Sequence, residues 1–227
     1  MTTTARAALF DLDGTLIDNM RFHAQVWVEM SRRLGLDYPQ AFFETETAGK
    51  KNVEILAMLL GSSATAADVA RLGAEKEALY RQRYRPHLKP VPGAVQLLER
   101  LSARGIPMAI ATLAPRENRE LALEGLGLSR FFQQVIGAEQ TPRGKPHPDI
   151  YLAAAASLGV PPADCVAFED AVNGVQSAVA AGIPTAAVTT ASPGEALRQA
   201  GASWILPDYR ELPRDLEERL FSPPRAP

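Results

Sequence analysis

The sequence contains one cysteine, Cys165, among its 227 residues. A single cysteine excludes an intramolecular disulfide, which is typical of proteins that fold in a reducing cytosol. The chain also lacks an apolar run approaching the roughly eighteen residues of a membrane span, and its polar residues 1–6 are not followed by the apolar segment of a signal peptide. These absences predict a cytoplasmic protein with no membrane partner. No histidine lies near Cys165 in the sequence, so we interpret it as a core residue.

A large excess of charge is missing as well. The 24 Lys and Arg residues are balanced by 26 Asp and Glu residues, and the pI is about 6.0. Nucleic-acid-binding proteins carry clustered positive charge, so no nucleic-acid partner is expected. A chain of this length and composition, 46% hydrophobic and 22% charged, can form one large domain or a core domain with an insertion. We expect a monomer and leave oligomers open.

A short apolar run ends in two carboxylates near the start of the chain. Residues 7–10 are apolar and too few for a helix, so they predict a strand that is buried on both faces. Asp11 and Asp13 follow, then Gly14, which permits a sharp turn. Two buried acids need compensation, which a divalent cation provides well. An ordinary acidic turn is the alternative; a calcium loop would need a Glu at its twelfth position, where Phe22 stands.

The next seventy residues have a helical pattern. Apolar residues recur every four positions from Phe22 to Leu34, and Thr65 with Asp68 resembles a capping box that starts a later helix. A Pro-rich segment, residues 89–93, then returns the chain to alternating helices and strands. We therefore predict an inserted helical cap domain at residues 19–89 and an α/β core domain at residues 1–18 and 90–227. The Pro-rich tail from Ser222 is expected to be disordered.

The alternation after residue 92 predicts an α/β fold with a doubly wound, Rossmann-like parallel sheet. Ligands bind at the carboxyl ends of the strands in such sheets. The expected strands at 7–10, 107–112 and 165–168 would bring acids and a threonine to this edge, and a lysine lies in a loop just before a predicted helix. The six side chains are Asp11, Asp13, Thr112, Lys145, Glu169 and Asp170.

This set of side chains fits a magnesium phosphate site, because Mg²⁺ prefers a few carboxylates together with phosphate oxygens and water. Asp11 can attack phosphorus to form an aspartyl-phosphate, and Asp13 can protonate the leaving oxygen. Lys145 and Thr112 can hold the phosphoryl oxygens. Taken singly, each of these residues also has a structural explanation. The Glu169–Asp170 pair, for example, could simply cap a helix.

Four segments together resemble the haloacid dehalogenase superfamily, in the subgroup with a small helical cap that includes β-phosphoglucomutase. They are FDLDGTLID, IATLA, GKPHPDIY and VAFEDAVNGVQSAVAAG, and the resemblance runs from about residue 8 to residue 190. It implies a cap inserted after the first strand and dependence on Mg²⁺, with the metal held by Asp11, Asp13, Glu169 and Asp170. Asp13 favours phosphate esters, because family members that act on haloacids or phosphonates lack an aspartate there.

The resemblance also implies which residues bind substrate. In the cap they are His23, Trp27, Gly49, Lys50, Lys51, Asn52 and Lys76. In the loop after Thr112 they are Leu113, Ala114 and Arg116. Lys76 interrupts an apolar stripe, and snorkelling of its side chain to solvent is the alternative to a role in binding. His23 could equally be a plain helix-surface residue.

We therefore predict a Mg²⁺-dependent phosphatase that acts on a small phosphorylated metabolite, in particular a sugar phosphate. A β-phosphoglucomutase that uses the same aspartyl-phosphate is the alternative. Asn52 stands where the mutase has an arginine, Asn19 where it has a threonine, and Pro115-Arg116 where it has Lys-Asn; these departures weaken the mutase assignment. A non-catalytic phospho-switch or binding protein is a remote alternative. Such a protein needs neither a cap nor an acid at the position of Asp13, whereas this sequence has Asp13 and predicts a cap.

Overall fold

The protein was analysed as a computed structural model, in which residues 5–47, 50–61 and 65–222 are described. Its centre is a parallel sheet of six strands in the order β3-β2-β1-β4-β5-β6. The strands are β1 (Ala7–Phe10), β2 (Met108–Ala111), β3 (Gln134–Ile136), β4 (Cys165–Glu169), β5 (Thr185–Val188) and β6 (Trp204–Leu206). The predicted α/β fold is confirmed.

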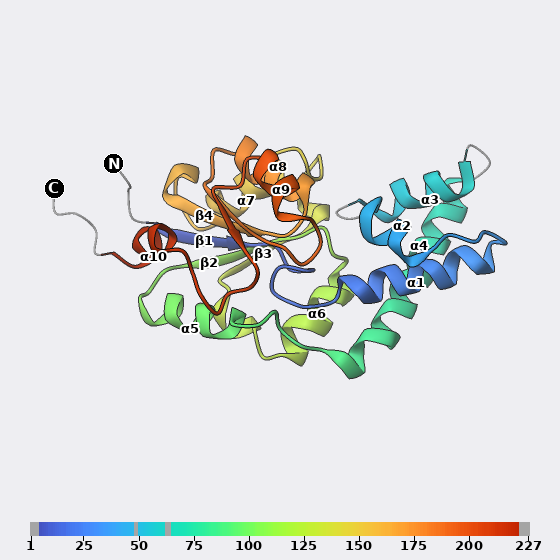
Figure 1. The fold of residues 1–227 in the computed structure, drawn as a ribbon, viewed down its shortest axis with the longest axis horizontal. Helices are drawn as coiled ribbons and strands as arrows, with labels where there is room; N and C mark the ends of the chain where they lie inside the picture. Colours follow the sequence, from blue (N-terminus) through green and yellow to red (C-terminus); the bar gives the residue numbers. More distant parts are fainter. Residues whose placement is uncertain (1–4, 48–49, 62–64, 223–227) are drawn as a thin grey trace.

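The central strands are buried throughout because helices cover both faces of the sheet (Figure 1). Side chains at alternate positions of a strand point to opposite faces. Phe10 packs with α5 (Ala94–Ala103), α6 (Arg116–Gly125) and α10 (Arg214–Phe221). Leu9 packs with α7 (Asp149–Ser157) and α8 (Val172–Ala180). On that same face, α9 (Gly194–Gln199) packs at the β5 side of the sheet.

A helical unit lies at one end of the molecule, inserted between β1 and β2 (Figure 1). Its helices are α1 (Met20–Arg33), α2 (Gln40–Thr45), α3 (Asn52–Leu60) and α4 (Ala66–Tyr84). The two connections to the sheet run side by side: the Asp18 amide donates to the Lys89 carbonyl at 3.1 Å, and the Lys89 ammonium pairs with the Asp18 carboxylate at 2.6 Å. The division of the chain into two domains stays a prediction. The two segments that connect the helical unit to the sheet nevertheless lie next to each other.

Local sequence signals agree with most helix and strand ends. The capping box of Thr65 and Asp68 starts α4 as predicted, and Pro115 directly precedes α6. Helices α2 and α10 were not predicted, because they are short and lie outside the segments with the clearest apolar periodicity. Only Ser222 of the tail expected to be disordered lies within the described residues. None of the described helices is long and apolar enough to cross a membrane.

Candidate active site

A cavity of about 830 Å³ lies between the carboxyl ends of the strands and the helical unit. All six residues predicted at the strand ends contribute to its lining. They come from the last residue of β4, from the segments directly after β1, β2 and β4, and from the loop before α7, so residues far apart in sequence meet at one edge of the sheet. The position agrees with the rule for ligand sites in open parallel sheets.

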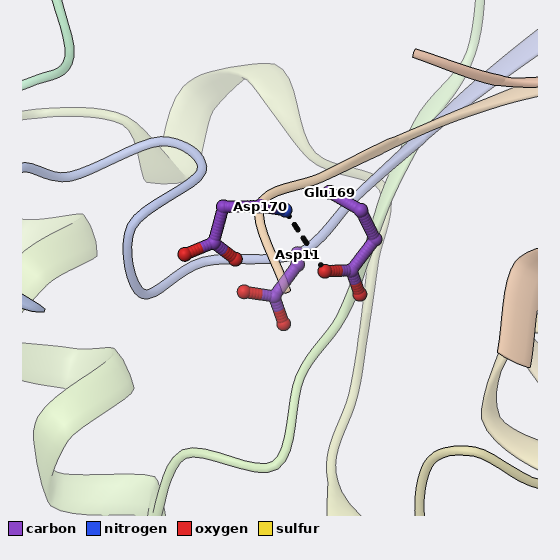
Figure 2. Close-up of side chains that lie close together, drawn as sticks. All are labelled: Asp11, Glu169 and Asp170. Carbon is purple, nitrogen blue, oxygen red and sulfur yellow. Dashed lines mark hydrogen bonds between the residues drawn. The ribbon is translucent and has the colours of Figure 1, made fainter. Parts of the chain in front are cut away.

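Three carboxylates converge at the base of the cavity (Figure 2). Asp11, Glu169 and Asp170 each offer an oxygen, and these oxygens all lie within 4.8 Å of one another. Burial raises the pKa of Asp11 to about 7; the Glu169 and Asp13 charges add to the rise, and Lys145 opposes it. Burial, followed by the Asp11 and Glu169 charges, also raises the pKa of Asp170 well above its ordinary value. The cluster therefore concentrates negative charge that requires compensation.

Lys145 supplies part of that compensation. Its ammonium contacts Asp11 Oδ1 at 2.6 Å and Glu169 Oε1 at 2.5 Å. Burial by itself would lower the pKa of Lys145, but the charges of Asp11 and Glu169 outweigh burial and raise it. The lysine therefore stays charged at neutral pH, beside Asp11, the carboxylate predicted to be the nucleophile.

The three carboxylates fit a divalent cation. Asp170 Oδ2 is buried and has no hydrogen-bond partner within the described parts of the chain, so one strong acceptor remains free for a ligand. A Cβ atom at Gly14 would overlap the Asp170 carboxylate, and one at Gly174 would overlap that of Glu169, so both glycines leave room for the acids. Asp11, Glu169 and Asp170 thus form a group that could hold a divalent cation.

The Asp13 carboxylate points away from this cluster and towards the helical unit. Its Oδ1 accepts a hydrogen bond from Asn19 Nδ2 at 2.7 Å, and its Oδ2 lies 3.7 Å from His23 Nε2. Its assignment as a metal ligand stays a prediction. Thr112 is buried beside the cavity, and its hydroxyl accepts a hydrogen bond from the Ala114 amide at 3.1 Å.

Lys76 and His23 both point into the cavity from the helical unit. The Lys76 side chain is only 3% exposed, so the snorkelling alternative is wrong. Its ammonium lies 2.8 Å from His23 Nδ1 and 5.3 Å from the centre of the Trp27 ring. The His23 ring stacks on Tyr80 with centroids 3.9 Å apart. His23 is therefore a partly buried residue that contacts Lys76 and Tyr80, and not a plain helix-surface residue.

The other predicted substrate-binding residues differ in whether they line the cavity. Lys50, Lys51, Asn52, Leu113 and Ala114 line the cavity together with Trp27. The Lys51 side chain extends from the helical unit to the core, where it lies so close to Gly144 that a Cβ atom at this glycine would overlap it. Arg116 does not line the cavity; its side chain is 79% exposed and pairs with Glu120 at 2.7 Å. Gly49 lies outside the described residues.

Residues 5–182 match the model of haloacid dehalogenase-like hydrolases. The chain belongs to this family. The predicted membership is confirmed, and the protein is accordingly an enzyme of the hydrolase class.

Relatives with assigned activities and solved structures agree with the family. Validoxylamine A 7'-phosphate phosphatase of Streptomyces hygroscopicus is 35% identical over 91% of this chain and 95% of its own. A family IA hydrolase structure from Entamoeba histolytica has a TM-score of 0.85 at 31% identity, covering 92% of this chain and 96% of its own. A β-phosphoglucomutase structure from Clostridium difficile has a TM-score of 0.82 at 25% identity, covering 95% of this chain and 97% of its own.

Three residues of this haloacid dehalogenase-like hydrolase were not predicted from the sequence: Tyr151, Glu77 and Asn118. Tyr151 donates a hydrogen bond from its hydroxyl to Glu169 Oε1 at 2.7 Å. Glu77, on α4, accepts a hydrogen bond from Asn118 of α6 at 2.6 Å and so joins the helical unit to the core. One signal could have revealed Glu77: it follows Lys76, so two adjacent charges interrupt the apolar pattern of that helix.

Proposed function

We propose that the protein is a Mg²⁺-dependent phosphatase of small phosphorylated metabolites, in particular sugar phosphates, and that it works through a phosphorylated Asp11. The observation that carries the proposal is the placement of two kinds of acid at the base of one cavity. Asp11, Glu169 and Asp170 gather around Lys145, whereas Asp13 stands apart on the side of the helical unit. A phosphatase needs both a nucleophile beside positive charge and a separate proton donor.

Asp11 is the nucleophile in this proposal. One of its carboxylate oxygens attacks phosphorus while the bond from phosphorus to the ester oxygen breaks, which leaves an acyl phosphate on Asp11. Lys145, 2.6 Å from Asp11 Oδ1, neutralises the carboxylate and orients the phosphoryl oxygens. Thr112 lines the same end of the cavity and can donate its hydroxyl proton to a phosphoryl oxygen. Mg²⁺ held by Asp11, Glu169 and Asp170 would supply further positive charge opposite those oxygens.

Asp13 is the acid and then the base. It donates a proton to the leaving alkoxide and later takes one from the water molecule that hydrolyses the acyl phosphate, which releases inorganic phosphate. Asn19 and His23 orient its carboxylate from the helical side. In this proposal, closure of the helical unit as a cap controls access of water, and so decides whether water or a sugar hydroxyl receives the phosphoryl group.

A phosphosugar mutase is the second candidate, and the observation that favours it is the similarity to a β-phosphoglucomutase structure at a TM-score of 0.82. A mutase would use the same Asp11 and Asp13 but pass the phosphoryl group to a sugar hydroxyl. The two functions differ in the acceptor, not in the residues that form the acyl phosphate.

The first experiment measures phosphate release from a panel of sugar monophosphates, with Mg²⁺ and with EDTA. We expect release that requires Mg²⁺ and is abolished by Asp11→Asn; release that survives this substitution would refute the proposal. β-Glucose 1-phosphate with a trace of the 1,6-bisphosphate separates the two candidates, because a mutase yields glucose 6-phosphate and a phosphatase yields inorganic phosphate.

A further inference from the structure

A buried ion pair lines the side of the cavity that the helical unit forms. The Lys76 ammonium contacts Glu77 Oε1 at 2.8 Å, and the two side chains are 3% and 9% exposed. Both residues line the cavity from α4. The imidazole of His23 lies between this pair and Asp13, in contact with Lys76 on one side and near the aspartate on the other. We refer to Lys76, Glu77 and their surroundings as the distal end.

Glu77 is fixed in place and charged. Its Oε1 also accepts a hydrogen bond from Asn52 Nδ2 at 2.8 Å, and its Oε2 accepts one from Asn118 Nδ2 at 2.6 Å. Burial would raise the pKa of Glu77, but the charges of Lys76 and His23 and the hydrogen bonds from Lys76 and Asn52 lower it to about 2. Its negative charge therefore persists at any pH at which the protein is assayed.

The positive charge of Lys76 is consequently matched within the distal end. The Lys76 ammonium also lies 2.8 Å from His23 Nδ1, a ring nitrogen that can accept a hydrogen bond from it. Arg21, Lys50 and Lys51 also line the cavity, but these three side chains are exposed, where water screens their charges. The buried pair thus leaves the distal end close to electrically neutral.

We propose that Glu77 is a specificity-determining residue that makes the distal end accept an uncharged, hydroxyl-rich group and reject a second phosphate. The inference rests on the proposed function and narrows its substrate class to sugar or polyol monophosphates. A hydroxyl can accept a hydrogen bond from Lys76 and donate one to Glu77, so it satisfies both members of the pair. A phosphate monoester is mostly the dianion at neutral pH, so it rarely has a proton to offer Glu77 and would place like charges side by side.

The test compares three monophosphates with the corresponding bisphosphates: glucose 6-phosphate, fructose 1-phosphate and xylulose 5-phosphate against glucose 1,6-bisphosphate, fructose 1,6-bisphosphate and xylulose 1,5-bisphosphate. Initial rates of phosphate release give kcat/KM for each. We expect the wild-type protein to prefer the monophosphates by about tenfold or more, and Glu77→Gln to reduce this preference by about tenfold. Glu75→Gln is the matched control, because Glu75 lies on the same helix but is 46% exposed and pairs with Arg71.

Glu77→Asp keeps the charge and should keep the preference. It provides a second variant if Glu77→Gln does not fold, and the wild-type preference is a test that needs no variant. A wild-type preference for bisphosphates, or an unchanged ratio in folded Glu77→Gln, would overturn the inference. Hydrolysis of p-nitrophenyl phosphate without hydrolysis of any of the six sugar esters would also overturn it, while leaving the proposed phosphatase function intact. Failure to hydrolyse p-nitrophenyl phosphate as well would count against the proposed function itself.

Discussion

Asn118 joins the core to the helical unit, and replacing it with alanine should weaken substrate capture. Its Nδ2 donates to Glu77 Oε2 at 2.6 Å, and its Oδ1 accepts from Arg81 Nη1 at 2.9 Å. Hydrogen bonds to charged groups contribute about 1.5–3 kcal/mol each. Glu77 keeps its bonds from Lys76 and Asn52, and Arg81 can return to water, so we expect a total loss of about 2 kcal/mol. That loss corresponds to roughly a 30-fold fall in kcat/KM.

The assay is the initial rate of phosphate release at low substrate concentration, with circular dichroism to verify that the variant is folded. Glu120→Gln is the control, because it removes a charge-assisted hydrogen bond on the same helix, to Arg116, without touching the helical unit. Adding Arg81→Ala to Asn118→Ala should change kcat/KM by less than about twofold, since the two residues share one interaction. A folded Asn118→Ala variant with unchanged kcat/KM would refute the reasoning.

Three further predictions concern the base of the cavity. Asp13→Asn should lower kcat for sugar phosphates by about 10²–10⁴ and affect p-nitrophenyl phosphate much less, because nitrophenolate leaves without a proton; equal losses for both esters would contradict the role of Asp13 as an acid. Burial raises the folded-state pKa of Asp11 from 3.8 to about 7, so its contribution to stability is present below about pH 3.8 and is lost as the pH rises through about 7. The Tm in EDTA should therefore fall between pH 5.5 and 8.5, and added Mg²⁺, which competes with protons, should raise the Tm more at pH 8.5; a pH-independent Mg²⁺ effect would argue against binding at this cluster. Gly174→Ala places a Cβ atom against the Glu169 carboxylate, so activity should require about tenfold more Mg²⁺, whereas Gly73→Ala, whose nearest neighbouring atom would be 3.8 Å away, should leave the Mg²⁺ requirement unchanged.

The fold and the base of the cavity were predictable because their signals are local. The apolar run of β1 followed directly by Asp11 indicates a buried strand that ends in an acid, whatever the rest of the chain does. The capping box at Thr65 likewise depends on residues three positions apart. Once the strands are parallel, their carboxyl ends must lie on one edge, so the convergence of Asp11 with Glu169 and Asp170 follows from topology.

The direction of individual side chains around the cavity was not predictable in the same way. The sequence pairs Asp13 with Asp11, yet the tertiary structure turns Asp13 towards Asn19 and His23. It also leaves Arg116 in solvent, although its neighbours Leu113 and Ala114 line the cavity. Such directions depend on the packing of the helical unit against the core, which involves residues distant in sequence.

The sequence by itself determined the α/β sheet, the inserted helices and the order of acids, threonine and lysine that assembles at the strand ends. Only the tertiary structure decided that Lys76 is neutralised by Glu77 and that Asn118, 41 positions further along the chain, holds Glu77 in place. The physical reason is that strand burial and helix capping are set by neighbours along the chain, whereas the charge of a cavity is set by which side chains packing brings together.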